Sequence, residues 1–373
     1  MENHLKAIRN ILLILLIIVT FAVLKLLGSL ILPLILAALL TILNLPVVNF
    51  LERRRIPRGL IAGVVALLTL GVLWLVVTVI GSTIEQLVAD IDVLAGQFNR
   101  KVNLAMGWVA ARIPGLNADY LWNEMDTVFS PDSIASLLKT ALGTVSSFGS
   151  STVLFLIYYL ILLSGATGYS AFIDYVFGEE NQGETRHVWE ATEQSIAAYM
   201  SIKTVISLVT GVLAWLICLA FGLQFALFWG FLAFLLNFIP SIGSILASAL
   251  PVFMGVIQFD GLGAVVALAL CLGASQFVIG SVIDPMVMGN RLRLNTITVI
   301  FGLLFWGYIW GIPGMLLSVP LMVMLRLLLE RTDDLAVVAR IMGNAPKRTP
   351  RRESLFARWV SRWEKSGKDA NGK

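Results

Sequence analysis

Charge is the scarcest property of this 373-residue sequence, because Asp, Glu, Lys and Arg together make up only 13% of it. That share is about half of what globular proteins usually carry. Hydrophobic residues make up 58%, so a soluble fold of this length would expose more apolar surface than soluble proteins tolerate. The composition excludes an ordinary soluble enzyme, a disordered chain and a nucleic-acid-binding domain built on a basic surface.

Histidine and cysteine are nearly absent too, with two of each. His4 and His187 lie outside the apolar runs, which argues against a membrane Ser–His hydrolase or a His-ligated zinc protease. Cys218 and Cys271 lie inside apolar runs and are interpreted as core thiols, not as a disulfide or metal ligands. HExxH, Walker and GxGxxG motifs are missing as well. We therefore expect no enzymatic activity, no metal and no cofactor.

Long uncharged stretches separate the few charged residues. No charged residue occurs over 56 positions from Thr204 to Phe259, and a second such run extends from Gly261 to Ile283. One spanning helix needs about 20 apolar residues, so the first run must fold back within the membrane. Similar runs cover 10–24, 26–51, 59–84 and 140–173. The sequence predicts an all-α polytopic membrane protein with about eight membrane segments.

The basic residues predict the orientation. Lys6 and Arg9 precede the first apolar run, four arginines lie between positions 53 and 58, and the tail after Glu330 holds 11 basic and 5 acidic residues. Basic residues concentrate on the cytoplasmic side, so both termini are predicted to be cytoplasmic. The first run is interpreted as a retained span, because no small-residue cleavage site follows it. The basic, Trp-containing tail favours the lipid bilayer as its partner, and we expect no nucleic-acid binding.

The chain divides into five predicted regions. These are three spans over 1–83, an extracytoplasmic amphipathic helical segment over 84–140, a fourth span and a cytoplasmic amphipathic helix over 141–203, a transport core over 204–330, and a basic cytoplasmic tail over 331–373. The extracytoplasmic segment is either a cap that packs on itself or on a neighbouring subunit, or a gate over a pathway.

Two Pro/Gly turns interrupt the apolar runs of the core and define two predicted broken hairpins. The turns contain the candidate pathway residues Asn237, Pro240, Ser241 and Gly243 in the first, and Gly311, Pro313 and Gly314 in the second. Pairs of interrupted hydrophobic segments point to the substrate site of a secondary transporter. Turns that simply emerge at the membrane surface would have no such meaning, and the turns alone leave both interpretations open.

Polar side chains near the turns favour a pathway. Asn237 and Ser241 belong to the first turn, and Gln276 lies in the next apolar run. Buried amides and hydroxyls can bind a polar, uncharged solute, although each can also hold helices together. Their grouping around the breaks makes a small-molecule solute the predicted ligand.

Asp284 is the carboxylate at a helix break behind this core. An ionisable residue at such a place is a functional candidate. It could take up a coupling proton or ion, or it could pair with Arg291 or Arg293. The alternative is a charge that marks the cytoplasmic boundary of the membrane.

Three segments of this half resemble the autoinducer-2 exporter (AI-2E) family. They are FLAFLLNFIPSIG at 231–243, DPMVMGNRL at 284–292 and FWGYIWGIPGMLLSVP at 305–320. The resemblance implies a bacterial or archaeal cell (inner) membrane protein that exports the furanosyl signalling molecule autoinducer-2. It also implies a homo-oligomer, plausibly a pentamer. Some relatives are linked to sodium–proton exchange instead.

Three functions therefore stand as hypotheses. The first is a secondary transporter that exports a small polar organic solute, with an autoinducer-2-like molecule favoured by the resemblance. The second is a sodium– or cation–proton antiporter, which requires Asp284 for ion exchange. The third is a non-transport membrane scaffold, which acts through its extracytoplasmic segment and basic tail and tolerates replacement of Asn237 and Ser241.

Overall fold

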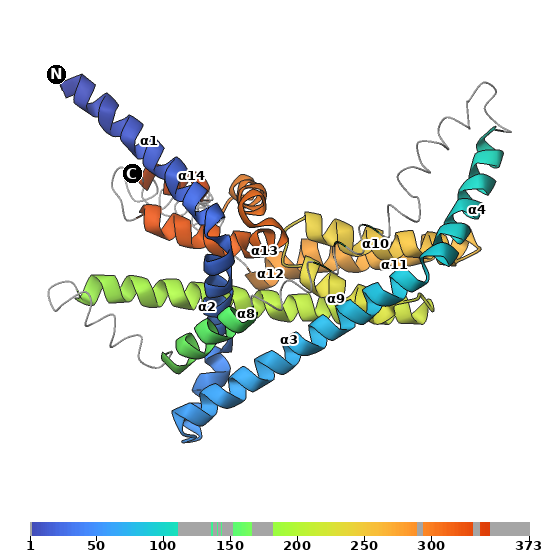
Figure 1. Ribbon diagram of the computed structural model, residues 1–373, viewed down its shortest axis with the longest axis horizontal. Helices are drawn as coiled ribbons and strands as arrows, with labels where there is room; N and C mark the ends of the chain where they lie inside the picture. Colours follow the sequence, from blue (N-terminus) through green and yellow to red (C-terminus); the bar gives the residue numbers. More distant parts are fainter. Residues whose placement is uncertain are drawn as a thin grey trace, which may run out of the picture.

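The computed structural model describes residues 2–110, 152–165, 182–288, 294–330 and 336–343, with positions 136, 140 and 143 (Figure 1). Within these residues every regular element is a helix, apart from one isolated bridge between Leu294 and Gly343. The predicted all-α class is confirmed for this part of the chain. About half of the predicted extracytoplasmic segment, the segment with Arg291 and Arg293, and most of the basic tail lie outside it.

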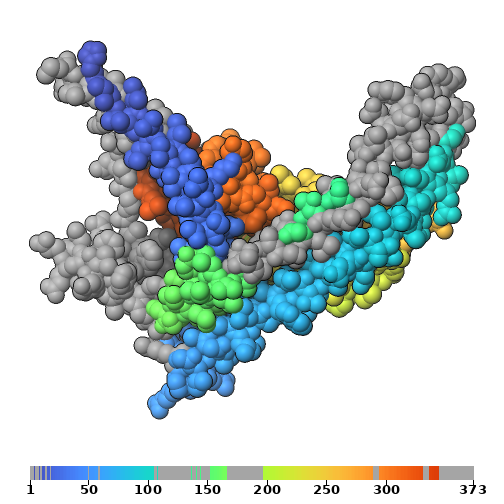
Figure 2. Space-filling model, viewed as in Figure 1, coloured from blue at the N-terminus to red at the C-terminus, as the bar shows by residue number. Residues whose placement is uncertain are grey.

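Four helices make up the first part of the chain. They are α1 (Glu2–Leu26), α2 (Gly28–Arg53), α3 (Arg58–Ala89) and α4 (Ile91–Ala110). Figure 2 shows α3 and α4 as a long arm along one edge of the molecule, with α1 projecting at the opposite end. The helix that contains residues 59–83 continues to Ala89, so the chain bends at Asp90 instead of at the predicted end of the span.

The second part of the chain contains the remaining labelled elements. They are α8 (Gln182–Ala220), α9 (Ala226–Leu236), α10 (Ile242–Gln258), α11 (Leu262–Val278), the π-helix η2 (Ile279–Ile283), α12 (Asp284–Met288), α13 (Thr296–Glu330) and α14 (Ala336–Met342). Helix α9 packs closely along α8, because glycines at the contact allow the backbones to meet. A Cβ atom on Gly211 would lie 2.8 Å from the carbonyl oxygen of Gly230.

Several helices have the length and composition of membrane spans. Among the described residues, five qualify: Gly28–Arg53, Gly59–Ala89, Ile196–Ala220, Leu262–Met288 and Thr296–Glu330. Three shorter helices are also apolar: Thr152–Gly165, Ala226–Leu236 and Ile242–Gln258. Large apolar side chains on these helices are widely exposed, including Leu67 at 72% and Leu262 at 81%. Lipid would cover such surfaces, so the chain is a multi-pass membrane protein.

Helix α8 corrects one prediction. The amphipathic helix predicted over 184–203 and the span predicted from Thr204 onward form one continuous helix. The predicted boundary follows from Lys203, the last charge before the uncharged run. In the structure Lys203 is only 6% exposed and carries a counter-ion, so the helix continues through this position.

Helix α13 contains the second Pro/Gly turn. Gly311 has φ 65° and ψ −144°, a non-helical conformation that L-residues with a side chain rarely adopt. A Cβ atom on Gly307 would lie 2.9 Å from the Met315 side chain, and one on Gly302 would meet the Met322 side chain. Residues on both sides of Gly311 therefore pair in reverse order, because the chain folds back at this glycine.

A polar triad joins α2, α3 and the helix Thr152–Gly165. The Asn44 amide donates to Tyr159 Oη at 2.8 Å and to Thr69 Oγ1 at 3.3 Å, and Thr69 Oγ1 lies 2.9 Å from Tyr159 Oη. The Asn44–Thr69–Tyr159 triad links the consecutive helices α2 and α3 to a third helix, because Tyr159 lies 90 residues after Thr69 and 115 after Asn44.

Candidate functional site

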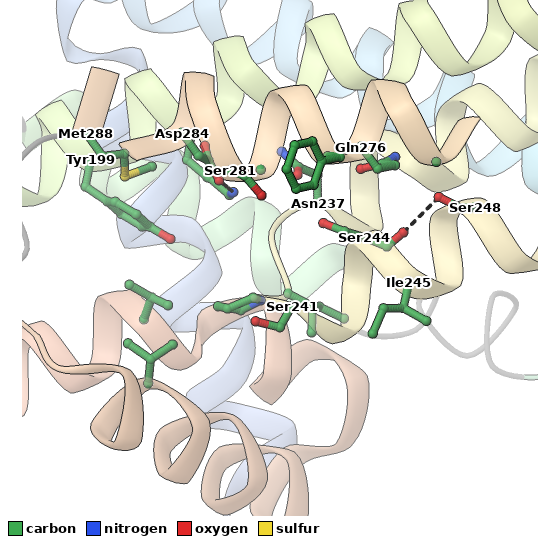
Figure 3. A pocket seen from close by; sticks show the side chains of 18 residues that line it. Tyr199, Asn237, Ser241, Ser244, Ile245, Ser248, Gln276, Ser281, Asp284 and Met288 are labelled. Atoms are coloured by element: carbon green, nitrogen blue, oxygen red, sulfur yellow. Dashed lines mark hydrogen bonds and ion pairs between the residues drawn. The ribbon is translucent and has the colours of Figure 1, made fainter. Parts of the chain in front are cut away.

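A cavity of about 570 Å³ lies in the core (Figure 3). Its lining comes from α8, from the turn between α9 and α10, from α10, and from the continuous segment α11–η2–α12, with two valines of α13. Five of the predicted site residues line it: Asn237, Pro240, Ser241, Gln276 and Asp284. The structure thus brings together residues from both uncharged runs.

The turn between α9 and α10 forms one wall of the cavity. Asn237 is 4% exposed at the end of α9, and its Nδ2 donates to Oγ of the fully buried Ser207 at 2.9 Å. Ser241 has φ 61°, so the backbone reverses sharply before α10 begins. Gly243 does not line the cavity, but a Cβ atom there would collide with the Leu236 carbonyl oxygen. Only glycine allows this turn to close against α9.

Gln276 presents an unused acceptor to the cavity. Its side chain is 7% exposed on α11, and its Oε1 atom has no hydrogen-bond partner among the described residues. A buried acceptor without a partner costs about 1–3 kcal/mol. A solute that donates a hydrogen bond to Oε1 would remove this cost.

Asp284 lies in the same cavity and is paired with a buried lysine. Lys203 Nζ lies 2.9 Å from Asp284 Oδ2, and the exposed fractions of the two side chains are 7% and 24%. The other carboxylate oxygen, Oδ1, is buried and has no partner in the described part of the chain. The Asp284 carboxylate is therefore ion-paired, with its side chain 24% exposed. Among the described residues its counter-ion is Lys203. The predicted partners Arg291 and Arg293 lie outside the described residues.

The residues of the second turn lie away from this cavity. Gly311, Pro313 and Gly314 are not among its lining residues. The turn instead meets the junction of α1 and α2, where Trp310 Nε1 donates to the Leu24 carbonyl oxygen at 3.0 Å. A Cβ atom on Gly314 would collide with the Trp306 carbonyl oxygen, much as Gly243 would collide with Leu236. The two turns share a close backbone contact but not a site.

Sequence reasoning missed several lining residues, of which Lys203 is the most important. Tyr199, Lys203 and Ser207 are spaced by four residues and are all buried on one side of α8. That spacing places side chains on one helix face, so it was a usable signal once α8 is known to be continuous. Ser281 also lines the cavity, between Gln276 and Asp284, and Figure 3 shows these three side chains in a row.

A π-helical turn separates Gln276 from Asp284. Residues Ile279–Ile283 form η2, and Gly280 and Ser281 within it line the cavity. Single π turns inside α-helices occur frequently at functional sites, because they re-aim the side chains that follow. No pattern in the sequence predicts this π-helical turn.

Comparisons with known proteins agree with this architecture. Residues 12–334 match the family described as AI-2E family transporter. A putative transport protein of Haemophilus influenzae is 30% identical over 348 residues, which is 92% of this chain and 99% of that protein. The AI-2 transport protein TqsA of Escherichia coli is 28% identical over 320 residues, covering 86% of this chain and 91% of TqsA. A second Escherichia coli relative, the putative transport protein YhhT, is 28% identical over 318 residues, covering 85% and 88%.

The match spans both halves of the described structure, including the cavity and both turns. The chain covers almost the whole length of these two relatives. The resemblance predicted from the core motifs is therefore confirmed. The chain is a membrane protein of the AI-2E transporter family.

Proposed function

We propose that this protein is a secondary transporter that exports a small polar organic solute through the cavity behind the α9–α10 turn. The observation that carries the proposal is the unpartnered, buried acceptor of Gln276 in a cavity lined by residues of both uncharged runs. An autoinducer-2-like molecule is the favoured solute, because the family and one relative are named for AI-2.

The depth of the first turn supports a substrate site within the membrane. Asn237 binds Ser207, which lies 11 residues after Ile196 and 13 residues before Ala220 in one candidate span. At 1.5 Å per residue, the turn is roughly 16 Å and 20 Å from the two ends of that span. Non-helical backbone at such depth requires a protein-lined or hydrated cavity.

The far ends of the two arms support a re-entrant hairpin. The Gln258 amide at the end of α10 donates to the Gly222 carbonyl oxygen at 2.7 Å, and its Oε1 accepts from the Gln224 N–H at 2.8 Å. The arms α9 and α10 thus enter beside the end of α8 and return to it. We propose that the reversal at Gly311 makes a second hairpin, which supports the site from outside the cavity lining.

The polar groups of the cavity favour a neutral, hydrogen-bonding solute. Serine hydroxyls at 241, 244, 248 and 281 line it beside the Gln276 amide. The charged groups there are Lys203 and Asp284, which neutralise each other. We propose that Asp284 is the group through which a proton or ion is coupled to transport.

The proposed setting follows the sequence predictions. We propose that both termini face the cytoplasm from a bacterial or archaeal cell membrane, and that the protein acts as a homo-oligomer, with the pentamer implied by the family resemblance. The widely exposed apolar side chains leave ample helix surface for lipid and for neighbouring subunits.

Solute flux tests the proposal directly. Purified protein in liposomes should move labelled autoinducer-2 or a related polyol when a proton or ion gradient is imposed. Gln276→Leu should lower this flux at least tenfold, since losing one buried hydrogen bond to the solute is worth about 1.4 kcal/mol or more. Gln86→Leu is the matched control, because Gln86 is exposed on α3. Absence of flux under any gradient would contradict the proposal.

A cation–proton antiporter is the second candidate. The observation that favours it is the buried Lys203–Asp284 pair with its unpartnered Oδ1 atom. It predicts sodium-dependent proton flux without any organic solute, and Asp284→Asn should abolish that flux. Unaltered exchange in the variant would exclude this role.

A further inference from the structure

The Lys203–Asp284 pair is part of the cavity lining. Lys203 belongs to α8 and Asp284 begins α12, so the pair joins two elements that are 81 residues apart in the sequence. In Figure 3, Tyr199 and Met288 lie on one side of Asp284, and Asn237 and Gln276 lie on the other. In this view Asp284 therefore lies between Tyr199 and Gln276.

The end of the cavity at which the pair lies is the one predicted to face the cytoplasm. Helix α8 runs from Lys203 past Ser207, which binds Asn237 of the turn, and on to Ala220, so Lys203 lies on the side of the turn where the predicted cytoplasmic helix 184–203 ends. Val299, near the start of α13, also lines the cavity. Asn295, just before α13, donates its backbone N–H to the Met342 carbonyl oxygen of α14 at 2.9 Å. Helix α14 belongs to the basic tail predicted over 331–373.

The π-helix η2, which directly precedes Asp284, could allow α12 to rotate about its helix axis. A π turn holds one residue more than an α turn, so converting η2 to α-helix would rotate the following residues by about 100°. Such a rotation would carry Asp284 away from Lys203. The space beside Gly280 is open, because a Cβ atom there would meet nothing within 4 Å.

We propose that Lys203 and Asp284 form a latch that closes the cytoplasmic end of the cavity, and that η2 is the hinge that opens it. The latch rests on the proposed function, since it regulates access to the solute site. A proton from water that binds the Asp284 carboxylate makes a neutral acid and removes the attraction to the Lys203 ammonium. The ionisable side chains among the described lining residues are Tyr199 and Lys203 on α8 and Asp284 on α12. The lining residues of α10, α11, η2 and α13 are uncharged.

The burial of the Lys203–Asp284 pair favours a role as a conformational switch over a role as a stabilising contact. Taking two charges out of water is costly, so a buried ion pair adds little net stability. One proton on Asp284 leaves the Lys203 ammonium as a buried charge without its counter-ion, which favours a second conformation in which the ammonium reaches water.

Thiol labelling tests the latch without any solute. Cys218 and Cys271 are replaced by alanine, and Ser244→Cys, which lies on α10 beyond the pair, is the reporter. A membrane-impermeant maleimide is added to vesicles in which the cytoplasmic face points outward. Lys203→Met and Asp284→Asn should each raise the labelling rate about tenfold, as expected when a closed population of about 90% or more is released.

Charge reversal makes the test specific. The double variant Lys203→Glu, Asp284→Lys should return labelling to the slow rate of the parent, while Lys101→Met, which neutralises a lysine far from the cavity, should leave the rate unchanged. Removal of Gly280 from the Asp284→Asn protein should also restore slow labelling. The shortened segment can be α-helical while the residues after it keep the orientation that they have with η2 in place, so the rotation of about 100° is no longer available. Monodisperse elution in detergent confirms that each variant is folded.

The outcomes separate the latch from the transport function. Single variants that label at the parent rate, or a folded charge-reversed protein that stays fast, would overturn the latch. Fast labelling that persists without Gly280 would overturn the hinge. A protein whose labelling follows the predictions but which moves no solute would instead count against the proposed function.

Discussion

The Asn44–Thr69–Tyr159 triad and the cavity of the core are two polar clusters in an otherwise apolar protein. They differ in how many of their polar atoms have hydrogen-bond partners. In the triad each side chain binds the other two, and Thr69 Oγ1 and Asn44 Nδ2 also donate to backbone carbonyls at 2.8 and 2.9 Å. In the cavity, Oε1 of Gln276 and Oδ1 of Asp284 have no partner among the described residues.

The difference distinguishes two uses of polar residues in membrane helices. A satisfied network holds helices together and makes no demand on a ligand. An unsatisfied cluster at a cavity is costly unless something binds there. Residue type alone does not separate the two, because both clusters contain an amide and hydroxyls.

Removing one member of the buried ion pair should have the largest effect. Lys203→Met leaves the Asp284 carboxylate partly buried without its counter-ion, which typically destabilises a protein by about 3–5 kcal/mol. We expect a marked drop in the thermal unfolding midpoint in detergent, together with loss of coupled transport. Lys203→Arg keeps the charge and should lose much less. Equal midpoints for the parent and the Met variant would contradict the assigned pair.

Closing the first turn with a side chain should have the next largest effect. Gly243→Ala would drive a methyl group into the Leu236 carbonyl oxygen and cost about 1–3 kcal/mol. Gly263→Ala on α11 is the matched control, because its Cβ would meet nothing within 4 Å and alanine favours helix. Thermal unfolding of both variants measures the difference. A Gly243→Ala protein as stable as the control would show that the turn does not need this close contact.

Breaking the triad should have a smaller effect that is confined to stability. Tyr159→Phe removes one hydroxyl and leaves Asn44 bound to Thr69, so we expect a loss of about 1 kcal/mol. Solute flux per folded molecule should stay within twofold of the parent. A large fall in flux at unchanged stability would place the triad in the transport pathway, and the triad would then not differ in function from the cavity.

The contact between α4 and α10 should have the smallest effect. Lys101 Nζ donates to the carbonyl oxygens of Val256 and Phe259 at the end of α10, and Asp260 beside it is 96% exposed. Lys101→Met removes a cation from a helix C-terminus, which is worth about 0.3–1 kcal/mol at the surface. Hydrogen exchange should speed up in the last turn of α10 and stay unchanged around Gln276. Faster exchange throughout the cavity would mean that α4 supports the site itself.

The membrane class and most of one wall of the cavity could be predicted from sequence. Asn237, Gln276 and Asp284 stand out because they are polar groups in or beside uncharged runs, where a soluble protein gives no such contrast. The first turn was visible for the same reason, since Pro240 and Gly243 interrupt an apolar run.

The rest of the site depends on tertiary contacts that no local pattern contains. Lys203 resembles an ordinary boundary lysine until α8 continues past it and Asp284 comes within 2.9 Å. The second turn carries the same Pro/Gly signal as the first, yet its surroundings are Trp310 and the α1–α2 junction instead of the cavity. The π turn η2 arises from how α11 joins α12.

The central claim is that the cavity cluster binds a solute whereas the triad holds helices together. One paired measurement tests it: solute flux and thermal unfolding of Gln276→Leu and Tyr159→Phe in the same preparations. The account predicts that Gln276→Leu loses at least tenfold in flux at equal or higher stability, since it removes an unsatisfied buried acceptor. Tyr159→Phe should lose stability and retain flux. Normal flux in a stable Gln276→Leu protein would contradict the account.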